Sequence, residues 1–227
     1  QVSVNSVLSL LVVIMLSSAV AAGFFDSLKT NIETQGEEPS KTPVKTALNN
    51  FYSGIGKHYL SFFGMFVLFF LLATGVIIGT FLFANKFVCS IDNLGISAND
   101  FFMMLAYPNQ MDVIMDNITK AQQAHLKTWC HLFLFATQAF TFFIMLWIPE
   151  KIYTGRNFVM ALFGSLKKIF TDFPNALCVY LTIMFLNYVL AIIVVFLSTF
   201  KLLVFLLNIA SLYLFVFNFY AIFIYYK

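Results

Sequence analysis

Charged residues are scarce in this chain, which is rich instead in long apolar runs. Only 10% of its 227 residues are Asp, Glu, Lys or Arg, whereas 61% are hydrophobic. Such a composition cannot cover a water-facing surface, which excludes an ordinary water-soluble globular protein. The long runs also argue against a membrane barrel, whose strands are short and alternate in polarity. The composition therefore predicts an all-α integral membrane protein.

Five apolar runs have the length of a membrane-spanning helix, about 20 residues. Backbone groups in hydrocarbon must satisfy their own hydrogen bonds, so each run is predicted to be helical. The predicted spans are 4–25, 59–85, 129–149, 174–199 and 202–226. Only Phe200 and Lys201 separate the last two, which predicts a tight hairpin. All residues from 1 to 227 are assigned to a single helical membrane domain.

The first apolar run has two interpretations. Ala19-Val20-Ala21 fits the small-residue pattern of a signal-peptidase site, but no basic residue precedes the run. We therefore favour a retained transmembrane helix over a cleaved signal peptide. Ser18 and Ala22 lie four residues apart and would give this helix a small-residue packing strip.

Basic residues divide unequally between the two sides of the predicted membrane. Segments 26–58 and 150–173 and the C-terminal residue share one side and carry nine Lys and Arg, against four on the other side. Basic residues near span ends are held on the cytoplasmic side. The count predicts that these segments lie inside, with the N-terminus outside. The membrane is expected to be the bacterial cytoplasmic membrane, with a eukaryotic or organellar membrane as the alternative.

Two amphipathic segments precede membrane spans on the predicted inner side. In 156–172 the apolar residues recur at helical spacing: Phe158, Val159, Leu162, Phe163, Leu166, Ile169 and Phe170. Arg156, Lys167 and Lys168 fall elsewhere on the helical wheel. This pattern predicts a helix lying in the inner interface, with its cations among anionic lipid headgroups. Residues 44–58, with Lys57, are predicted to form a second interfacial helix.

The two amphipathic segments align when the numbering is shifted by 111 residues, which places Lys57 on Lys168. Each segment is followed by a span outward and a span back. This order indicates a parallel repeat, related by a pseudo-twofold axis along the membrane normal. The alternative is a chance alignment of two amphipathic helices.

The predicted outer side carries an insertion at about 87–128. Ser97 or Asn99 is a suitable cap for a short helix, and a polar helix is expected over 110–127. We expect this helical insertion to serve packing rather than interaction. Cys89 and Cys130 flank it, and they form either a disulfide or two free, buried thiols.

Catalytic motifs and cofactor-binding motifs are missing from the sequence. There is no HExxH motif, no cysteine pair at zinc spacing and no glycine-rich phosphate loop after a strand. We therefore expect neither enzymatic activity nor a bound cofactor or metal, and we expect no nucleic-acid partner. The predicted spans also contain no Asp, Glu, Lys or Arg, which argues against an ion-coupled transporter.

Polar residues inside the spans are amides and hydroxyls. A polar seam would contain Gln138, Asn187, Asn208 and Asn218. Helix-to-helix hydrogen bonding is the more common role of such residues. Gly75 and Gly79 form a GxxxG pattern in the second span, which permits close packing of another helix.

The pattern WIPEKIYTGRNFVMALFGSLKKIFTDFPNAL, followed by two closely spaced spans, resembles uncharacterised bacterial multi-spanning membrane proteins. These are similar to the membrane domain that precedes the catalytic domain in some glycerophosphodiester phosphodiesterases. The resemblance covers mainly residues 147–227, and residues 43–85 show the same pattern more weakly. It implies a membrane architecture and no catalytic residue, and the outer insertion and the phenylalanine bias depart from it.

Two functional hypotheses follow from these observations. The first is a non-enzymatic membrane scaffold or subunit, whose spans pack against a membrane protein partner. The second is a transporter or channel for a neutral or amphipathic solute, lined by the amide seam. The missing catalytic groups, the GxxxG pattern and the interfacial helices favour the first.

Overall fold

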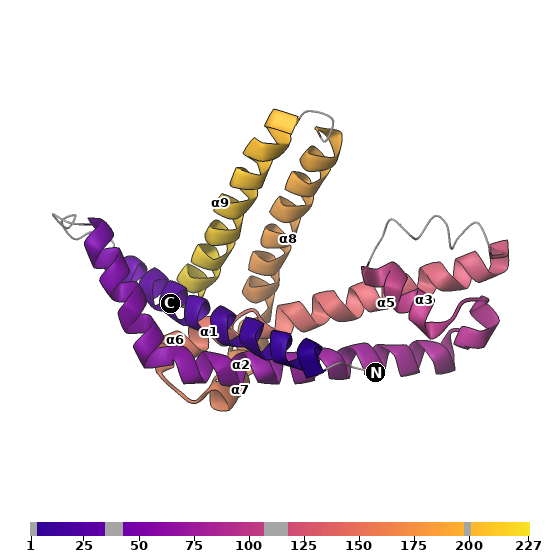
Figure 1. Cartoon of the computed structure of the whole chain (residues 1–227), viewed down its shortest axis with the longest axis horizontal. Coiled ribbons are helices and arrows are strands. Elements are labelled where there is room, and N and C mark those ends of the chain that lie inside the picture. Colours follow the sequence, from indigo (N-terminus) through magenta and orange to yellow (C-terminus); the bar gives the residue numbers. More distant parts are fainter. Residues whose placement is uncertain (1–3, 35–42, 107–117, 198–200) are drawn as a thin grey trace. The chain divides into compact units, whose positions relative to one another are not determined.

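The computed structural model describes residues 4–34, 43–106, 118–197 and 201–227. These residues are helical wherever they form regular secondary structure, and no strand occurs among them. Within them, five helical stretches are long and apolar enough to cross a membrane. The all-α prediction and the five predicted spans are thus confirmed at this level. These five stretches are consistent with a multi-pass membrane protein, and Figure 1 shows the long helices of the chain.

The chain forms two compact units. The first contains residues 1–68 and 142–227, and the second contains residues 69–141, although the sequence predicts a single domain. The helices of the first unit are α1 (Val4–Glu33), the first part of α2 (Pro43–Phe87), α6 (Trp147–Thr154), α7 (Phe158–Thr171), α8 (Phe173–Phe196) and α9 (Lys201–Tyr226). The second unit contains the rest of α2, the 3-10 helix η1 (Ile91–Leu94), α3 (Ala98–Ala106) and most of α5 (Lys120–Ile144).

Helices α1 and α2 pack closely in the first unit because small residues meet at their contact. A Cβ added to Gly54 would lie 2.8 Å from the Ala22 carbonyl oxygen, and one added to Gly23 would lie 2.8 Å from the Phe51 carbonyl oxygen. Ser18 and Ala22 are fully buried. The small-residue packing strip predicted for the first span is confirmed.

The interfacial helix predicted at 44–58 is not separate from the span that follows it. Helix α2 continues for 45 residues, more than twice the about 20 residues that span a hydrocarbon core. No proline occurs between its first residue, Pro43, and Phe87, and its glycines do not interrupt the backbone hydrogen bonds. The predicted helix end at residue 58 is therefore wrong, because one continuous helix covers both segments. Its ribbon bends between two arms (Figure 1), and the interfacial position of the first arm stays a prediction.

Helix α7 confirms the second amphipathic helix, predicted at 156–172. The side chain of Asn157 caps it by accepting hydrogen bonds from the Val159 and Met160 N–H groups. It ends before Asp172, and Pro174 lies in the first turn of α8, where its missing N–H costs no helical hydrogen bond. A break therefore separates α7 from α8, whereas the corresponding stretch of α2 is continuous. The parallel repeat stays a prediction.

One face of α7 is buried, and the opposite face exposes apolar side chains. Ala161, Ser165 and Ile169, spaced four residues apart, pack inward. Phe163 is 62% exposed and Phe170 is 64% exposed. An exposed phenylalanine face is expected of a helix that lies in a membrane interface.

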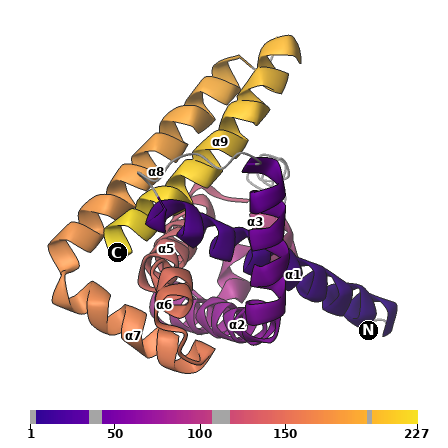
Figure 2. The ribbon, with the colours of Figure 1, turned by 90° about the vertical axis from the view of Figure 1, so that its left-hand side faces the viewer.

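Helices α8 and α9 lie side by side as an antiparallel hairpin (Figure 2). Helix α8 ends at Phe196 and α9 begins at Lys201, which confirms a short connection. Phe200, predicted to lie in the turn, is outside the described residues.

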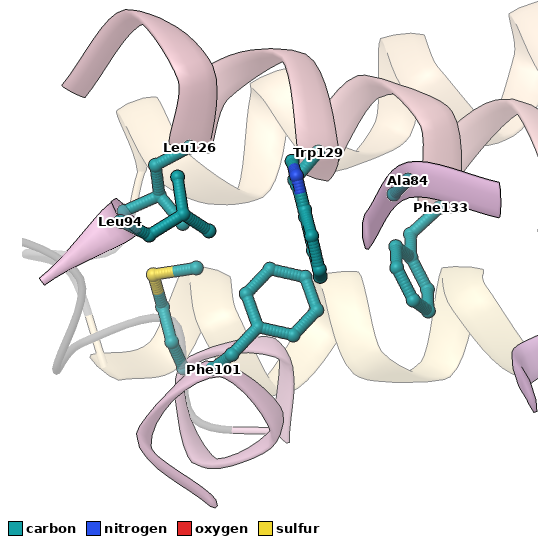
Figure 3. Close-up of a cluster of buried hydrophobic side chains, with 7 residues drawn as sticks. Ala84, Leu94, Phe101, Leu126, Trp129 and Phe133 are labelled. Atoms are coloured by element: carbon teal, nitrogen blue, oxygen red, sulfur yellow. The ribbon is translucent and has the colours of Figure 1, made fainter. Parts of the chain in front are cut away.

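The second unit is organised around Trp129, which is fully buried. The Trp129 ring makes edge contacts with Phe81 and Phe101, at centroid distances of 5.4 and 5.1 Å. Figure 3 shows this tryptophan on α5 facing side chains from α3 and the η1 segment. The complete buried cluster consists of Ala84, Leu94, Phe101, Met104, Leu126, Trp129 and Phe133. The described part of the predicted outer insertion thus serves packing.

Two capping boxes define the helix starts of the insertion. The Ser97 hydroxyl accepts a hydrogen bond from the Asp100 N–H (3.1 Å), and the Asp100 carboxylate accepts one from the Ser97 N–H (3.2 Å). The Ser97 hydroxyl also donates to the Asp100 carboxylate at 2.6 Å, and this bond, together with the one from the Ser97 N–H, lowers the pKa of the Asp100 carboxyl. Ser97, and not Asn99, is therefore the cap of α3. Thr119 and Gln122 form a similar reciprocal pair before α5.

The polar helix predicted at 110–127 does not match the helix that the structure has in the described residues of this range. Helix α5 begins at Lys120, after the Thr119 cap, and continues into the third predicted span. Residues 110–117 lie outside the described residues. In the structure Cys89 and Cys130 are half-buried thiols that both pack against the Trp129 cluster, and no disulfide joins them.

Candidate functional site: a buried polar cluster at Glu150

The short helix α6 brings charged residues into the interior of the first unit. The Trp147 indole N–H donates to the Phe158 carbonyl at 2.7 Å and holds α6 against the start of α7. Gly155 ends α6 with a φ of 65°, a left-handed conformation that suits glycine. Glu150 and Lys151 in this helix are only 4% and 6% exposed. Burial of two adjacent ionisable residues is uncommon, and it marks α6 as a candidate site.

Glu150 is paired with residues from two other segments. The Tyr226 hydroxyl of α9 donates a hydrogen bond to Glu150 Oε2 at 2.5 Å. Arg156 Nη1 lies 3.4 Å from Glu150 Oε1, although the Arg156 side chain is 58% exposed. A buried carboxylate needs such donors because burial alone disfavours its charged form. The Tyr226 hydroxyl is the buried donor, and Arg156 connects the carboxylate to the surface.

Lys168 of α7 completes this polar cluster, which we define as Glu150, Arg156, Lys168 and Tyr226. The Lys168 ammonium donates to the Tyr226 carbonyl oxygen and lies 3.7 Å from the centre of the Tyr226 ring. Burial lowers the pKa of Lys168, while the negative charges of Glu150 and Asp172 act in the opposite direction. Lys168 therefore holds the end of α9.

Gly164 of α7 makes room for the Glu150 carboxylate. A Cβ added at Gly164 would lie 2.7 Å from Glu150 Cδ and closer still to Glu150 Oε1. Glycine usually costs a helix about 1 kcal/mol relative to alanine. Its presence in the middle of α7 is explained by the carboxylate that lies against it.

We expect Gly164→Ala to destabilise the protein although alanine is the better helix former. The added methyl group would push the buried carboxylate away from Tyr226, at a cost of about 1–3 kcal/mol. Gly56→Ala is the matched control, because nothing lies within 4 Å of a Cβ at Gly56 in the described structure. The control should be neutral or stabilising by up to about 1 kcal/mol. Thermal unfolding in detergent measures both, and equal midpoints for the two variants would contradict the assignment.

Other polar contacts join the ends of the same helices. The Tyr225 hydroxyl of α9 donates to Asp172 Oδ2 at 2.7 Å, at the break between α7 and α8. On α1, Asp26 is 3.3 Å from the His58 ring of α2 and 3.8 Å from the Lys57 ammonium. Tyr225 and Asp26 thus each connect two helices.

A series of aromatic rings leads from the α1–α2 contact to the polar cluster. Phe25 stacks on Phe62 at 5.9 Å and on Phe223 at 5.8 Å between ring centroids. Tyr153 of α6 continues the series, at 5.9 Å from Phe223 and 5.3 Å from Tyr226. These rings pack four helices of the first unit together beside the polar cluster.

The residues of the predicted polar seam are found in separate places. Gln138 belongs to the second unit, whereas the three asparagines belong to the first. Asn187 is exposed and donates to the Ile183 carbonyl of its own helix at 2.7 Å. Asn208 is exposed, and Asn218 is half-buried with its side-chain oxygen unpaired among the described residues.

The glycines predicted to pack another helix and the basic residues predicted to contact headgroups have different environments. Nothing lies within 4 Å of a Cβ at Gly75 or Gly79 in the described structure, so this face of α2 is open. Lys167 is exposed, as expected of a residue among headgroups, and Lys57 is 62% exposed beside Asp26. Lys168 instead contacts Tyr226 of the same chain.

Glu150 and Tyr226 were missed by sequence reasoning. Glu150 directly follows the predicted end of the third span at residue 149, a position where a carboxylate is expected to face water. The chain turns at residues 145 and 146 and then forms α6, which returns Glu150 to the interior. Gly164, in the middle of an amphipathic helix, was the one signal in the sequence for a close contact.

The polar cluster is suited to positioning helix ends and to holding a proton between a carboxylate and a phenol. Among the described residues, no group of three or more His, Cys, Asp or Glu is arranged to hold a metal ion. Comparisons with protein-family models, with curated proteins and with solved structures find no match. The resemblance to bacterial multi-spanning proteins thus stays a prediction.

Proposed function

We propose that this protein is a non-enzymatic subunit or scaffold of a larger membrane complex. One observation carries the proposal: the exposed amide of Asn187, near the middle of α8. An amide facing hydrocarbon costs free energy, because lipid tails offer it no hydrogen-bond partner. Among the described residues its Nδ2 bonds to a backbone carbonyl of α8, which leaves its oxygen available to a helix of another protein.

The open face of α2 supports the same proposal. Gly75 and Gly79 weaken the helix, yet nothing in the described structure approaches their Cα atoms closely enough to require glycine. A partner helix packed on the GxxxG face would account for both glycines. The proposed partner is a membrane protein. The protein is also proposed to contact the bilayer, including its anionic headgroups.

The proposed location is the bacterial cytoplasmic membrane. Support comes from the nine basic residues of the predicted inner segments, against four on the other side. The polar cluster belongs to the inner segments on this assignment, and so does the exposed Lys167.

The proposal is tested by replacing Asn187 with leucine. We expect the wild-type protein, extracted in mild detergent, to be recovered as a stoichiometric part of a larger complex. Asn187→Leu should weaken that complex about fivefold, in line with the 1 kcal/mol scale of hydrogen bonds between membrane helices. The isolated chain should keep its thermal unfolding midpoint, because the side chain is exposed.

Phe185→Leu, at a side chain that is 64% exposed on the same helix, is the control and should leave the complex intact. A wild-type protein recovered as a monomer or homodimer would overturn the subunit proposal. If Asn187→Leu and Asn208→Leu instead abolish a solute flux into liposomes, the transporter alternative is supported.

A further inference from the structure

A half-open apolar groove runs along α1 in the first unit. Its volume is about 570 Å³. Helices α1, α2, α6 and α9 form its walls, with the lining residues Leu16, Ser17, Val20, Ala21, Phe24, Phe25, Phe66, Ile148, Phe215 and Phe219. Ser17 contributes the one polar side chain among them, so the groove is suited to a hydrocarbon ligand.

The walls of the groove are aromatic and well packed. Phe219 lies 4.9 Å from Phe25 and 4.9 Å from Phe215 between ring centroids, both in edge-on contacts. On α1, Ser17 and Ala21 contribute small side chains to the lining, one helical turn apart.

The groove has a cationic residue beyond its inner end. Phe25 lines that end and stacks on Phe62 and Phe223. One turn further along α1, the Lys29 ammonium lies 3.5 Å from the carbonyl oxygen of Ile152. Ile152 is itself one turn beyond Ile148 of the groove wall, so the ammonium is about one helical turn from the groove.

The contacts of the Lys29 ammonium within the protein do not use all of its capacity for hydrogen bonds and ion pairs. The ammonium is 5.4 Å from the centre of the Tyr153 ring and 3.8 Å from Glu33 Oε1, and the Lys29 side chain is 25% exposed. The Glu33 side chain is itself 46% exposed, so this ion pair is weak. The ammonium is therefore able to accept an additional anionic partner.

We propose that the groove binds one acyl chain of an anionic membrane phospholipid, whose phosphate contacts Lys29. The groove lies along helices long and apolar enough to span a membrane, so acyl chains surround it. A helix about 10 Å wide occupies roughly 120 Å³ per residue, and fewer than five residues would fit. The space suits a flexible chain, and the neighbouring cation selects an anionic headgroup.

This inference does not depend on the proposed subunit role. A lipid held in the groove would fill the space between α1 and α9, and would stabilise the first unit by mass action. The subunit proposal concerns the exposed face of α8 and the open face of α2, which are different surfaces.

The proposal is tested with phosphatidylglycerol carrying a photoreactive diazirine on one acyl chain. The full chain is reconstituted in nanodiscs with this probe, irradiated, digested and analysed by mass spectrometry. We expect adducts concentrated in residues 16–25 and 215–219. Adducts spread evenly over all five predicted spans would show ordinary surrounding lipid and would overturn the proposal.

Two substitutions separate the groove from the headgroup contact. Ala21→Leu fills the groove and should reduce the adducts at 215–219 about tenfold, whereas Ala19→Leu, outside the lining, should not. Ser17→Leu gives a second groove-filling variant if Ala21→Leu fails to fold. Unchanged labelling in a folded groove-filling variant would overturn the proposal.

Lys29→Gln tests the anionic headgroup. Native mass spectrometry should show the wild-type protein retaining phosphatidylglycerol in preference to phosphatidylcholine. Lys29→Gln should reduce this preference about fivefold, the effect expected of one lysine near a membrane surface. Lys167→Gln removes the same charge from an exposed site and should keep the preference. Equal effects of the two variants would overturn the proposal.

Discussion

Glu150→Ala is expected to lower the thermal unfolding midpoint by about 6–12 °C, which corresponds to about 3 kcal/mol for a chain of this length. The substitution leaves the Tyr226 hydroxyl without its acceptor, at a cost of about 1–3 kcal/mol. It also opens a void where α6, α7 and α9 meet, which adds to the loss. Thermal unfolding of the purified protein in detergent measures the effect.

Glu150→Gln is the control for this prediction. Glutamine keeps the shape of the side chain and an oxygen that can accept from Tyr226. It loses the ion pair with Arg156, which is 58% exposed and contributes little. We expect a cost of about 1 kcal/mol or less. If the alanine and glutamine variants unfold at the same temperature, the Tyr226 hydrogen bond does not stabilise the fold.

Trp129→Ala is expected to destabilise the second unit by about 3–5 kcal/mol, the usual cost of removing a fully buried tryptophan. Phe81 and Phe101 would lose their edge contacts with the indole ring. Hydrogen exchange followed by mass spectrometry should show faster exchange in η1 and α3. The first unit should keep its protection, because the chain forms two compact units.

Two further variants sharpen the Trp129 prediction. The Trp129 indole N–H is buried and has no hydrogen-bond partner among the described residues. Trp129→Phe therefore loses ring volume but no hydrogen bond, and it should cost clearly less than Trp129→Ala. Phe102→Ala removes a side chain that is 39% exposed and should cost less again. Equal destabilisation by all three variants would contradict the central role of Trp129.

The polar cluster and the aromatic series form one continuous interior in the first unit. Tyr226 belongs to both, since its ring stacks on Tyr153 and its hydroxyl donates to Glu150. Phe25 lies at the other end, where it lines the groove proposed for lipid. A bound acyl chain would therefore contact the same stack of rings that packs beside Glu150.

Local features of the sequence predicted the helical elements well. The apolar runs identify five helices because hydrocarbon leaves the backbone no other way to satisfy its hydrogen bonds. Ser97, one of the two predicted candidates, is the cap because its hydroxyl accepts from a backbone N–H only three residues away. Pro174 marks the start of α8 for an equally local reason.

Local features misled where continuity of a helix was in question. The segment 44–58 has the amphipathic pattern of an interfacial helix, and so does 156–172. Only the second is separated from its span, because Pro174 follows it, whereas α2 has no internal proline. An amphipathic pattern indicates which face is apolar and does not indicate where a helix ends.

The sequence by itself determined the long apolar helices and narrowed the cap of α3 to Ser97 or Asn99. These depend on composition and on contacts between residues a few positions apart. Only the tertiary structure decided that Glu150 is buried, that Tyr226 is its partner 76 positions away and that Gly164 makes room for it. Such pairings depend on how separate helices pack, and neither the spacing of apolar residues nor the charge count contains that information.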